Sequence, residues 1–207
     1  MQTLKVWILL ATLASTVRLL AQTASNVKID DPQARVLVVT EQPRHPSALH
    51  EHTMNRVMIY LGGGQMTFTR PSGKLDKLTV KAGDVRWSPP DGQHISENVG
   101  DQPFQVVEIE LKNSPHPGVT MSPLDPLKTD PKHYSLEFEN DQVRVLRVRF
   151  GPNEKGVQHE HKLNHIVVYL TDQARGKAGE VRLDGPMTHS EQNPLDRAVE
   201  RIAVDLK

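Results

Sequence analysis

The chain has 207 residues, with 25 basic and 25 acidic side chains and a formal net charge of zero. This balance leaves no excess of positive charge of the kind that indicates binding to nucleic acid or to an anionic membrane surface. There is no cysteine, which excludes disulfides and thiolate metal sites, so any bound metal must be held by nitrogen and oxygen ligands.

The first 24 residues predict a secretory signal peptide. Lys5 supplies a positive start, and residues 6–17 are uncharged and mostly apolar. This run is shorter than the roughly 20 apolar residues that a spanning helix needs, but its length is typical of the apolar region of a signal. We therefore expect an exported protein, periplasmic or secreted, without stable membrane insertion. The alternative is a disordered or membrane-tethered N-terminus.

Short apolar bursts bounded by turn residues indicate an all-β domain over residues 25–112. The predicted strands cover residues 35–39, 57–61, 65–69, 78–80 and 106–111. In the last of these, Val107, Ile109 and Leu111 alternate with Glu108 and Glu110, the period of a strand with one buried face. Strands this short, with turns this closely spaced, predict a sandwich or barrel.

A proline-rich linker is predicted to lead into a second domain of the same kind. Residues 113–131 contain five prolines and no strand pattern, which is typical of a spacer between domains. Beyond it, residues 143–150, 166–170 and 202–206 again read as strands. The second domain therefore covers residues 132–207.

The two domains are copies of one repeat. Four matched features carry this conclusion: His50-Glu51-His52 and His159-Glu160-His161, Arg35-Val36-Leu37 and Arg144-Val145-Leu146, Tyr60-Leu61 and Tyr169-Leu170, and His94 with Asn98 and His189 with Asn193. The first three pairs share an offset of 109 residues. Copy two is shorter in its middle, with 9 positions from Leu170 to Gly179 against 22 from Leu61 to Gly83. It is therefore expected to lack about one hairpin.

The repeated histidines make metal coordination the leading hypothesis for copy one. Residues i and i+2 of a strand share a face, so His50 and His52 can aim at one point, and His94 supplies a third imidazole from a distant strand. Arg56 follows four residues after His52. Three interpretations stay open for it: it clamps an anionic substrate over a metal, it replaces the metal and binds a carboxylate, or it is a surface arginine without a role.

Copy two offers up to four imidazoles, from His159, His161, His165 and His189. Such ligands suit Fe, Zn, Mn, Ni or Cu, and the ligand type does not choose among these metals. Three ligands would leave positions for substrate or oxygen, whereas four in a tetrahedron would make a closed, structural site. The alternative for both copies is a duplication whose histidines are only buried and hydrogen-bonded.

The motifs resemble those of the cupin superfamily. The resemblance rests on His50-Glu51-His52, on the segment from Gly83 to His94, and on Asn98, and it covers nearly the whole chain after residue 24 as a tandem pair, a bicupin. It implies two small jelly-roll barrels, each with a metal site inside. The second half, from residue 133 to residue 148, is similar to small bacterial cupins of unknown function. The usual cupin glutamate is absent from both copies, where Arg56 and His165 hold its place.

Cupins with three histidines and no glutamate occur among thiol and diketone dioxygenases, so the resemblance implies a metal-dependent enzyme acting on a small organic molecule. The leading version is oxygen-dependent chemistry at ferrous iron, with an isomerase or lyase next. In it, His165 and Arg56 are the candidate catalytic residues beside the metal ligands. The competing hypothesis is a barrel that binds a small ligand or a metal without turnover, and a third is a duplication in which one copy only supports the other. Family analogy also allows a homodimer.

Overall fold

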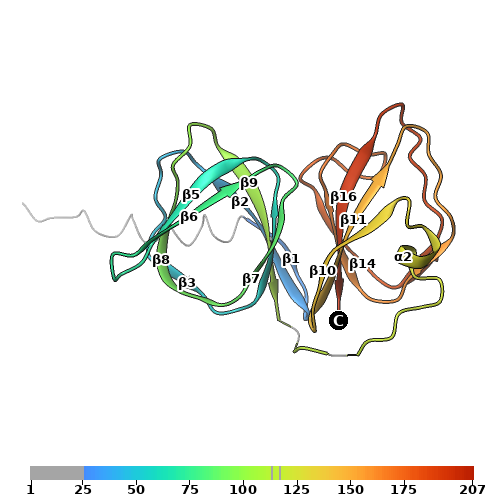
Figure 1. The fold of residues 1–207 in the computed structure, drawn as a ribbon, viewed down its shortest axis with the longest axis horizontal. Coiled ribbons are helices and arrows are strands. Elements are labelled where there is room, and N and C mark those ends of the chain that lie inside the picture. The colour runs from blue at the N-terminus through green and yellow to red at the C-terminus, as the bar shows by residue number, and fades with distance from the viewer. Residues whose placement is uncertain (1–25, 113, 117) are drawn as a thin grey trace, which may run out of the picture.

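The computed structural model describes residues 26–112, 114–116 and 118–207, and the predicted signal peptide lies outside these residues. Two β barrels lie side by side (Figure 1). The one helix among the described residues is α2 (Pro126–Thr129). The prediction of an all-β chain built from two tandem barrels is therefore confirmed. No helix in the described part is both long and apolar enough to span a bilayer.

The first barrel is made of two antiparallel sheets. The larger sheet has the order β1 (Val27–Asp30), β2 (Ala34–Glu41), β9 (Phe104–Leu111), β4 (Arg56–Tyr60) and β7 (Val85–Ser88). The smaller has the order β3 (His50–His52), β8 (Asp91–Asn98), β5 (Gly64–Thr69) and β6 (Leu75–Val80). Strands distant in sequence are neighbours in both sheets, as in a jelly roll.

The second barrel repeats this order with two strands fewer. Its larger sheet runs β10 (Tyr134–Glu139), β11 (Val143–Phe150), β16 (Val199–Leu206), β13 (His165–Tyr169) and β14 (Val181–Asp184). Its smaller sheet holds β12 (His159–His161) and β15 (Met187–His189). Among the described residues nothing corresponds to the hairpin β5–β6, so the predicted loss of one hairpin is confirmed.

The large sheets of the two barrels pack against each other through a shared apolar core. In β4, Val57 and Ile59 join this core, whereas Met58 and Tyr60 pack in a separate cluster of the first barrel. Strand β13 contributes Ile166 and Val168 to the shared core in the same way. Both faces of these strands are therefore covered, which explains why they read as continuous apolar runs.

Two reciprocal hydrogen bonds join the rims of these packed sheets. Asn55 Nδ2 donates to Gln142 Oε1 at 2.6 Å, and Asn164 Nδ2 donates to Gln33 Oε1 at 2.7 Å. The asparagines are 109 residues apart and so are the glutamines. Each copy thus presents the same two side chains to the other copy.

The end of the segment predicted as a linker packs against the second barrel. Asp125 and Asp130 are buried there, and Asp125 accepts a hydrogen bond from the Leu127 N–H at the start of α2. Asp125 also accepts hydrogen bonds from Arg144 in β11 through both of its oxygens. A carboxylate from this segment therefore reaches the interior of the second barrel.

Candidate metal centres

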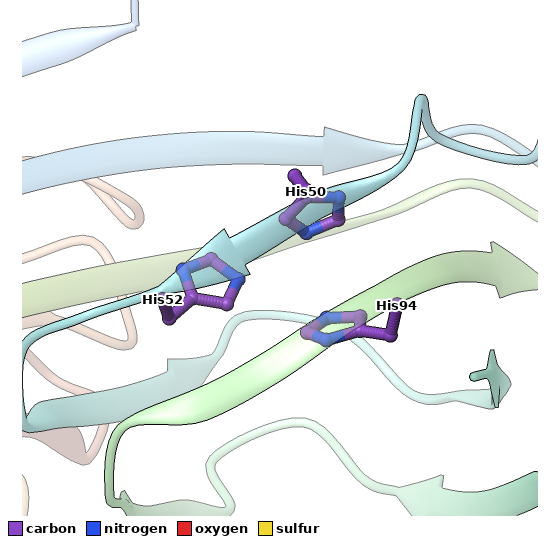
Figure 2. Close-up of side chains that lie close together, drawn as sticks. All are labelled: His50, His52 and His94. Atoms are coloured by element: carbon purple, nitrogen blue, oxygen red, sulfur yellow. The ribbon is translucent and has the colours of Figure 1, made fainter. Parts of the chain in front are cut away.

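In the first barrel, three histidines from two paired strands face one another. Strand β3 pairs with β8 so that His50 lies opposite His94, and His52 is on the same face of β3 as His50. One ring nitrogen from each of the three lies within 4.8 Å of the others. Figure 2 shows the three imidazoles turned toward a common point between β3 and β8.

The hydrogen bonds of two of these rings leave their Nε2 atoms free to coordinate. His50 Nδ1 lies 2.8 Å from the Ala48 carbonyl oxygen, and His94 Nδ1 lies 2.8 Å from the Gly92 carbonyl oxygen. A carbonyl can only accept, so Nδ1 carries the proton in both rings and Nε2 keeps its lone pair. Burial, and then the positive charge of Arg56, lower the pKa of His52 to about 3, so this ring is neutral at pH 7.

Arg56 is buried, which excludes the interpretation of a surface residue. Its guanidinium donates to Glu108 Oε2 at 3.1 Å and to Ser88 Oγ at 3.0 Å. Burial raises the pKa of Glu108, and the charge of Arg56 opposes that shift. Arg56 therefore does bind a carboxylate, but the carboxylate belongs to a neighbouring strand of its own barrel.

The second barrel forms a matching cluster from β12 and β15. His159 lies opposite His189, as His50 lies opposite His94, and His161 is the third member. Ring nitrogens of the three lie within 4.8 Å of one another. This cluster is deeper than the first, because both histidines of β12 are buried whereas both histidines of β3 are partly exposed.

Two features of this cluster fit a metal ion. His159 Nδ1 donates to the Val157 carbonyl at 3.0 Å, which leaves Nε2 as the ligand atom. His189 Nε2 is buried and has no hydrogen-bond partner among the described residues, and a buried polar atom is rarely left in that state. Burial lowers the pKa of both rings, that of His189 to about 4. The rings are therefore neutral at pH 7, the form that binds metals.

His165 does not group with these three, which favours the three-imidazole alternative over the four-imidazole one. Its ring stacks on that of His161, with centroids 4.4 Å apart, and its donor nitrogen groups with His161 and Asp205 instead. The physical reason is position: His165 begins β13 in the larger sheet, where it lies opposite Asp205, whereas the other three histidines belong to the smaller sheet. His159, His161 and His189 alone leave room for further ligands.

Three residues that the sequence reasoning missed lie beside this cluster. The Tyr134 hydroxyl lies 3.0 Å from His159 Nε2 and donates to Glu191 Oε2 at 2.6 Å, and Arg201 forms an ion pair with Glu191. Burial opposes ionisation of Glu191, but Arg201 and Tyr134 hold its pKa at about 2. Burial and the charge of Glu191 raise the pKa of Tyr134. Glu191 follows His189 by two residues, just beyond the end of β15, and this closeness in sequence is the one local signal for it, whereas no local spacing identifies Tyr134.

A cavity of about 510 Å³ adjoins the second cluster. Its lining includes His161, His189, Tyr134, Glu191, Arg201 and Arg182. Arg182 is held by both oxygens of Asp184. The cavity gives a small molecule a place beside the three histidines, with a neutral tyrosine and fixed charges around it.

No family model matches the chain, and no curated protein matches it. Solved structures do match it. AerE from Microcystis aeruginosa is 9% identical and has a TM-score of 0.56, covering 87% of this chain and 96% of its own. A cupin 2 conserved barrel domain protein from Leptotrichia buccalis is 12% identical, with a TM-score of 0.54 and 87% of each chain covered. Oxalate decarboxylase from Bacillus subtilis, described with Mn(II) centres, is 12% identical, with a TM-score of 0.59 and coverage of 86% and 70%. At these identities the likeness is one of fold.

Proposed function

We propose that this chain, a tandem cupin by its fold, is a metal-dependent enzyme that acts on a small organic molecule in its second barrel. The observation that carries the proposal is the cluster of His159, His161 and His189, whose donor atoms converge beside a cavity of about 510 Å³. Three protein ligands leave coordination positions for water, oxygen or substrate. A divalent transition metal, with ferrous iron as the first to test, would supply Lewis-acid or oxygen-dependent chemistry there.

The residues around the cluster have separate tasks in this proposal. His159, His161 and His189 hold the metal. Tyr134 stays protonated because its pKa is raised. Its one hydroxyl proton is donated to Glu191, so the hydroxyl oxygen can accept a hydrogen bond from the bound substrate. Glu191 orients that hydroxyl, and the ion pair with Arg201 keeps Glu191 ionised. Because His165 lies outside the three-histidine set, we assign it no ligand role at this centre.

The first barrel is assigned a lesser role. Its three histidines can also hold a divalent metal, but two of them are partly exposed. Burial and then the positive charge of Arg56 lower the pKa of His52, and the same charge disfavours a cation beside that ring. We therefore expect weaker metal binding in the first barrel than in the second.

The decisive measurement is metal content by mass spectrometry on protein purified without a His-tag and reconstituted separately with Fe²⁺, Mn²⁺, Zn²⁺, Ni²⁺ and Cu²⁺. We expect His159→Ala to lose the tightly bound metal and Glu160→Ala to keep it, because Glu160 points away from the cluster. The iron form is then screened for oxygen uptake with small organic acids, thiols and diketones. Absence of metal from the wild type in every reconstitution refutes the proposal. Metal and ligand binding without turnover would instead establish the binding-module alternative.

Export is proposed on the sequence of residues 1–24. The chain is expected to be cleaved after Ala21 or Ala24 when it is produced in a bacterial host. Cell fractionation followed by N-terminal sequencing of the recovered protein tests this. An uncleaved chain in the cytoplasm contradicts it.

A further inference from the structure

A second group of donor atoms lies in the second barrel, next to the three-histidine cluster. It consists of His161, His165 and Asp205, with one donor atom from each within 4.8 Å of the others. All three residues are buried, with exposed fractions of 5% or less. His161 belongs to both groups, so the two groups share one imidazole ring.

Two of these donor atoms lack partners. His161 Nδ1 and Asp205 Oδ1 are buried, and neither has a hydrogen-bond partner among the described residues. They lie 3.9 Å apart, which is too far for a hydrogen bond. His165 Nδ1 donates to the Leu163 carbonyl at 3.2 Å, which leaves its Nε2 as an acceptor. Two imidazole nitrogens and a carboxylate oxygen therefore lie close together in the barrel interior. A turn of the His165 ring out of its stack on His161 would aim both imidazole lone pairs at one ion.

The first barrel shows how the same framework looks when the carboxylate is satisfied. Glu110 lies opposite Arg56 on the neighbouring strand, as Asp205 lies opposite His165. There Arg35 donates to Glu110 Oε2 at 2.5 Å. The repeat places Arg56 where the second barrel has His165, so the first barrel has Arg35 bound to this carboxylate and no imidazole in the place of His165.

In the second barrel the matching arginine is drawn away from the carboxylate. Arg144 is the repeat equivalent of Arg35 and lies opposite Asp205, but its guanidinium is bound by both oxygens of Asp125. Its Nη1 remains 3.8 Å from Asp205 Oδ2. Asp125 thus accepts the close contacts of Arg144, and Asp205 keeps Arg144 only at 3.8 Å, beyond hydrogen-bond distance.

We propose that His161, His165 and Asp205 form a second binding site for a divalent transition metal. Two nitrogens and one oxygen form a ligand set that suits Zn²⁺, Co²⁺ or Cu²⁺. His161 binds this ion through Nδ1 and the ion of the three-histidine centre through Nε2. When both positions are filled, the imidazole releases its remaining ring proton to solvent, and the negative charges of Asp205 and the imidazolate offset part of the added positive charge. This second site does not depend on the proposed activity, since it shares only His161 with the three-histidine centre.

The test is metal stoichiometry by equilibrium dialysis against Co²⁺. All measurements use the full chain in a His50→Ala background, which removes the cluster of the first barrel. We expect two Co²⁺ per chain in this background, one after Asp205→Asn, one after His159→Ala, and none after combining Asp205→Asn with His159→Ala. Glu110→Gln is the matched control in the first barrel and should leave the count at two. His165→Phe repeats the test without changing a charge, and thermal melting confirms that each variant is folded.

The outcomes separate this site from the proposed function. If Asp205→Asn or His165→Phe leaves the count unchanged in folded protein, the second site is refuted. If His159→Ala changes nothing but Asp205→Asn abolishes binding, the second site stands and the three-histidine centre fails. With Cu²⁺ in both positions, an imidazolate bridge predicts exchange coupling in the electron paramagnetic resonance spectrum, and this coupling should disappear after Asp205→Asn. Two Cu²⁺ per chain without coupling would overturn the shared role of His161.

Discussion

Replacing Asp125 with asparagine tests how the second barrel distributes its buried charge. The substitution keeps a side-chain oxygen that can accept from the Leu127 N–H, but it removes the negative charge that binds Arg144. Breaking a buried ion pair by removing one partner costs about 3–5 kcal/mol, because the other charge is left uncompensated. Arg144 has a second carboxylate in reach, however, since its Nη1 lies 3.8 Å from Asp205 Oδ2.

We therefore expect Asp125→Asn to lower the free energy of unfolding by only about 1–3 kcal/mol in metal-free protein, because a small movement of Arg144 restores an ion pair. In an Asp205→Asn background this second carboxylate is missing, and the same substitution should cost the full amount, about 3–5 kcal/mol. The assay is urea unfolding in the presence of a chelator, for the wild type, both single variants and the double variant. A second readout is Co²⁺ stoichiometry, which should fall by one equivalent in Asp125→Asn because Arg144 now occupies Asp205. Stability losses that add within about 0.5 kcal/mol would refute the reasoning, since additivity means that the two carboxylates do not share the arginine.

Three further predictions concern pH, metal removal and the core. His52 and His189 have pKa values of about 3 and about 4 in the folded chain, below the value of an unfolded histidine, so the unfolded state binds more protons. The free energy of unfolding should therefore fall as the pH drops below about 6.5, with a slope that approaches 1.4 kcal/mol per pH unit for each ring. Equal free energies of unfolding in urea titrations of metal-free protein at pH 7 and pH 5 would contradict this. Chelation should lower the melting temperature of the reconstituted wild type more than that of His159→Ala, because a ligand present at about 100 times its Kd stabilises the folded state by about 2.7 kcal/mol. Equal shifts in melting temperature would count against the metal centre of the second barrel. Ile59→Ala should cost about 2–5 kcal/mol, because Ile59 is fully buried in the core that the barrels share, whereas the exposed Leu75 gives a matched control in which Leu75→Ala should change little.

The fold and the three-histidine clusters were accessible from the sequence because their signals are local or repeated. Strand period places His159 and His161 on one face, and the repeat of His94 as His189 supplies the third ligand. The shortened span between Leu170 and Gly179 likewise predicted the missing hairpin. Each of these inferences needs only spacing within a strand or comparison of one copy with the other.

The rest depends on which strands become neighbours, and spacing does not contain that information. Arg56 looked free to face a ligand because its partner, Glu108, lies 52 residues further along the chain. His165 follows His161 by four residues but enters the other sheet, where Asp205 lies opposite it. Asp125 lay in a stretch read as a spacer, and only folding brings it to Arg144. Each of these contacts is set by the tertiary arrangement of the barrel.

The reciprocal bonds between Asn55 and Gln142 and between Asn164 and Gln33 describe an isologous interface, the kind that a pair of identical subunits forms about a twofold axis. The chain therefore carries within one polypeptide the contact surface of a dimer of single barrels. A homodimer of the whole chain must use another face, because these sheets already cover each other. Because the two halves are encoded separately in one chain, their sequences can differ. In one half Arg35 binds Glu110, whereas in the other Arg144 binds Asp125. Two identical subunits encoded by one repeat cannot differ in this way.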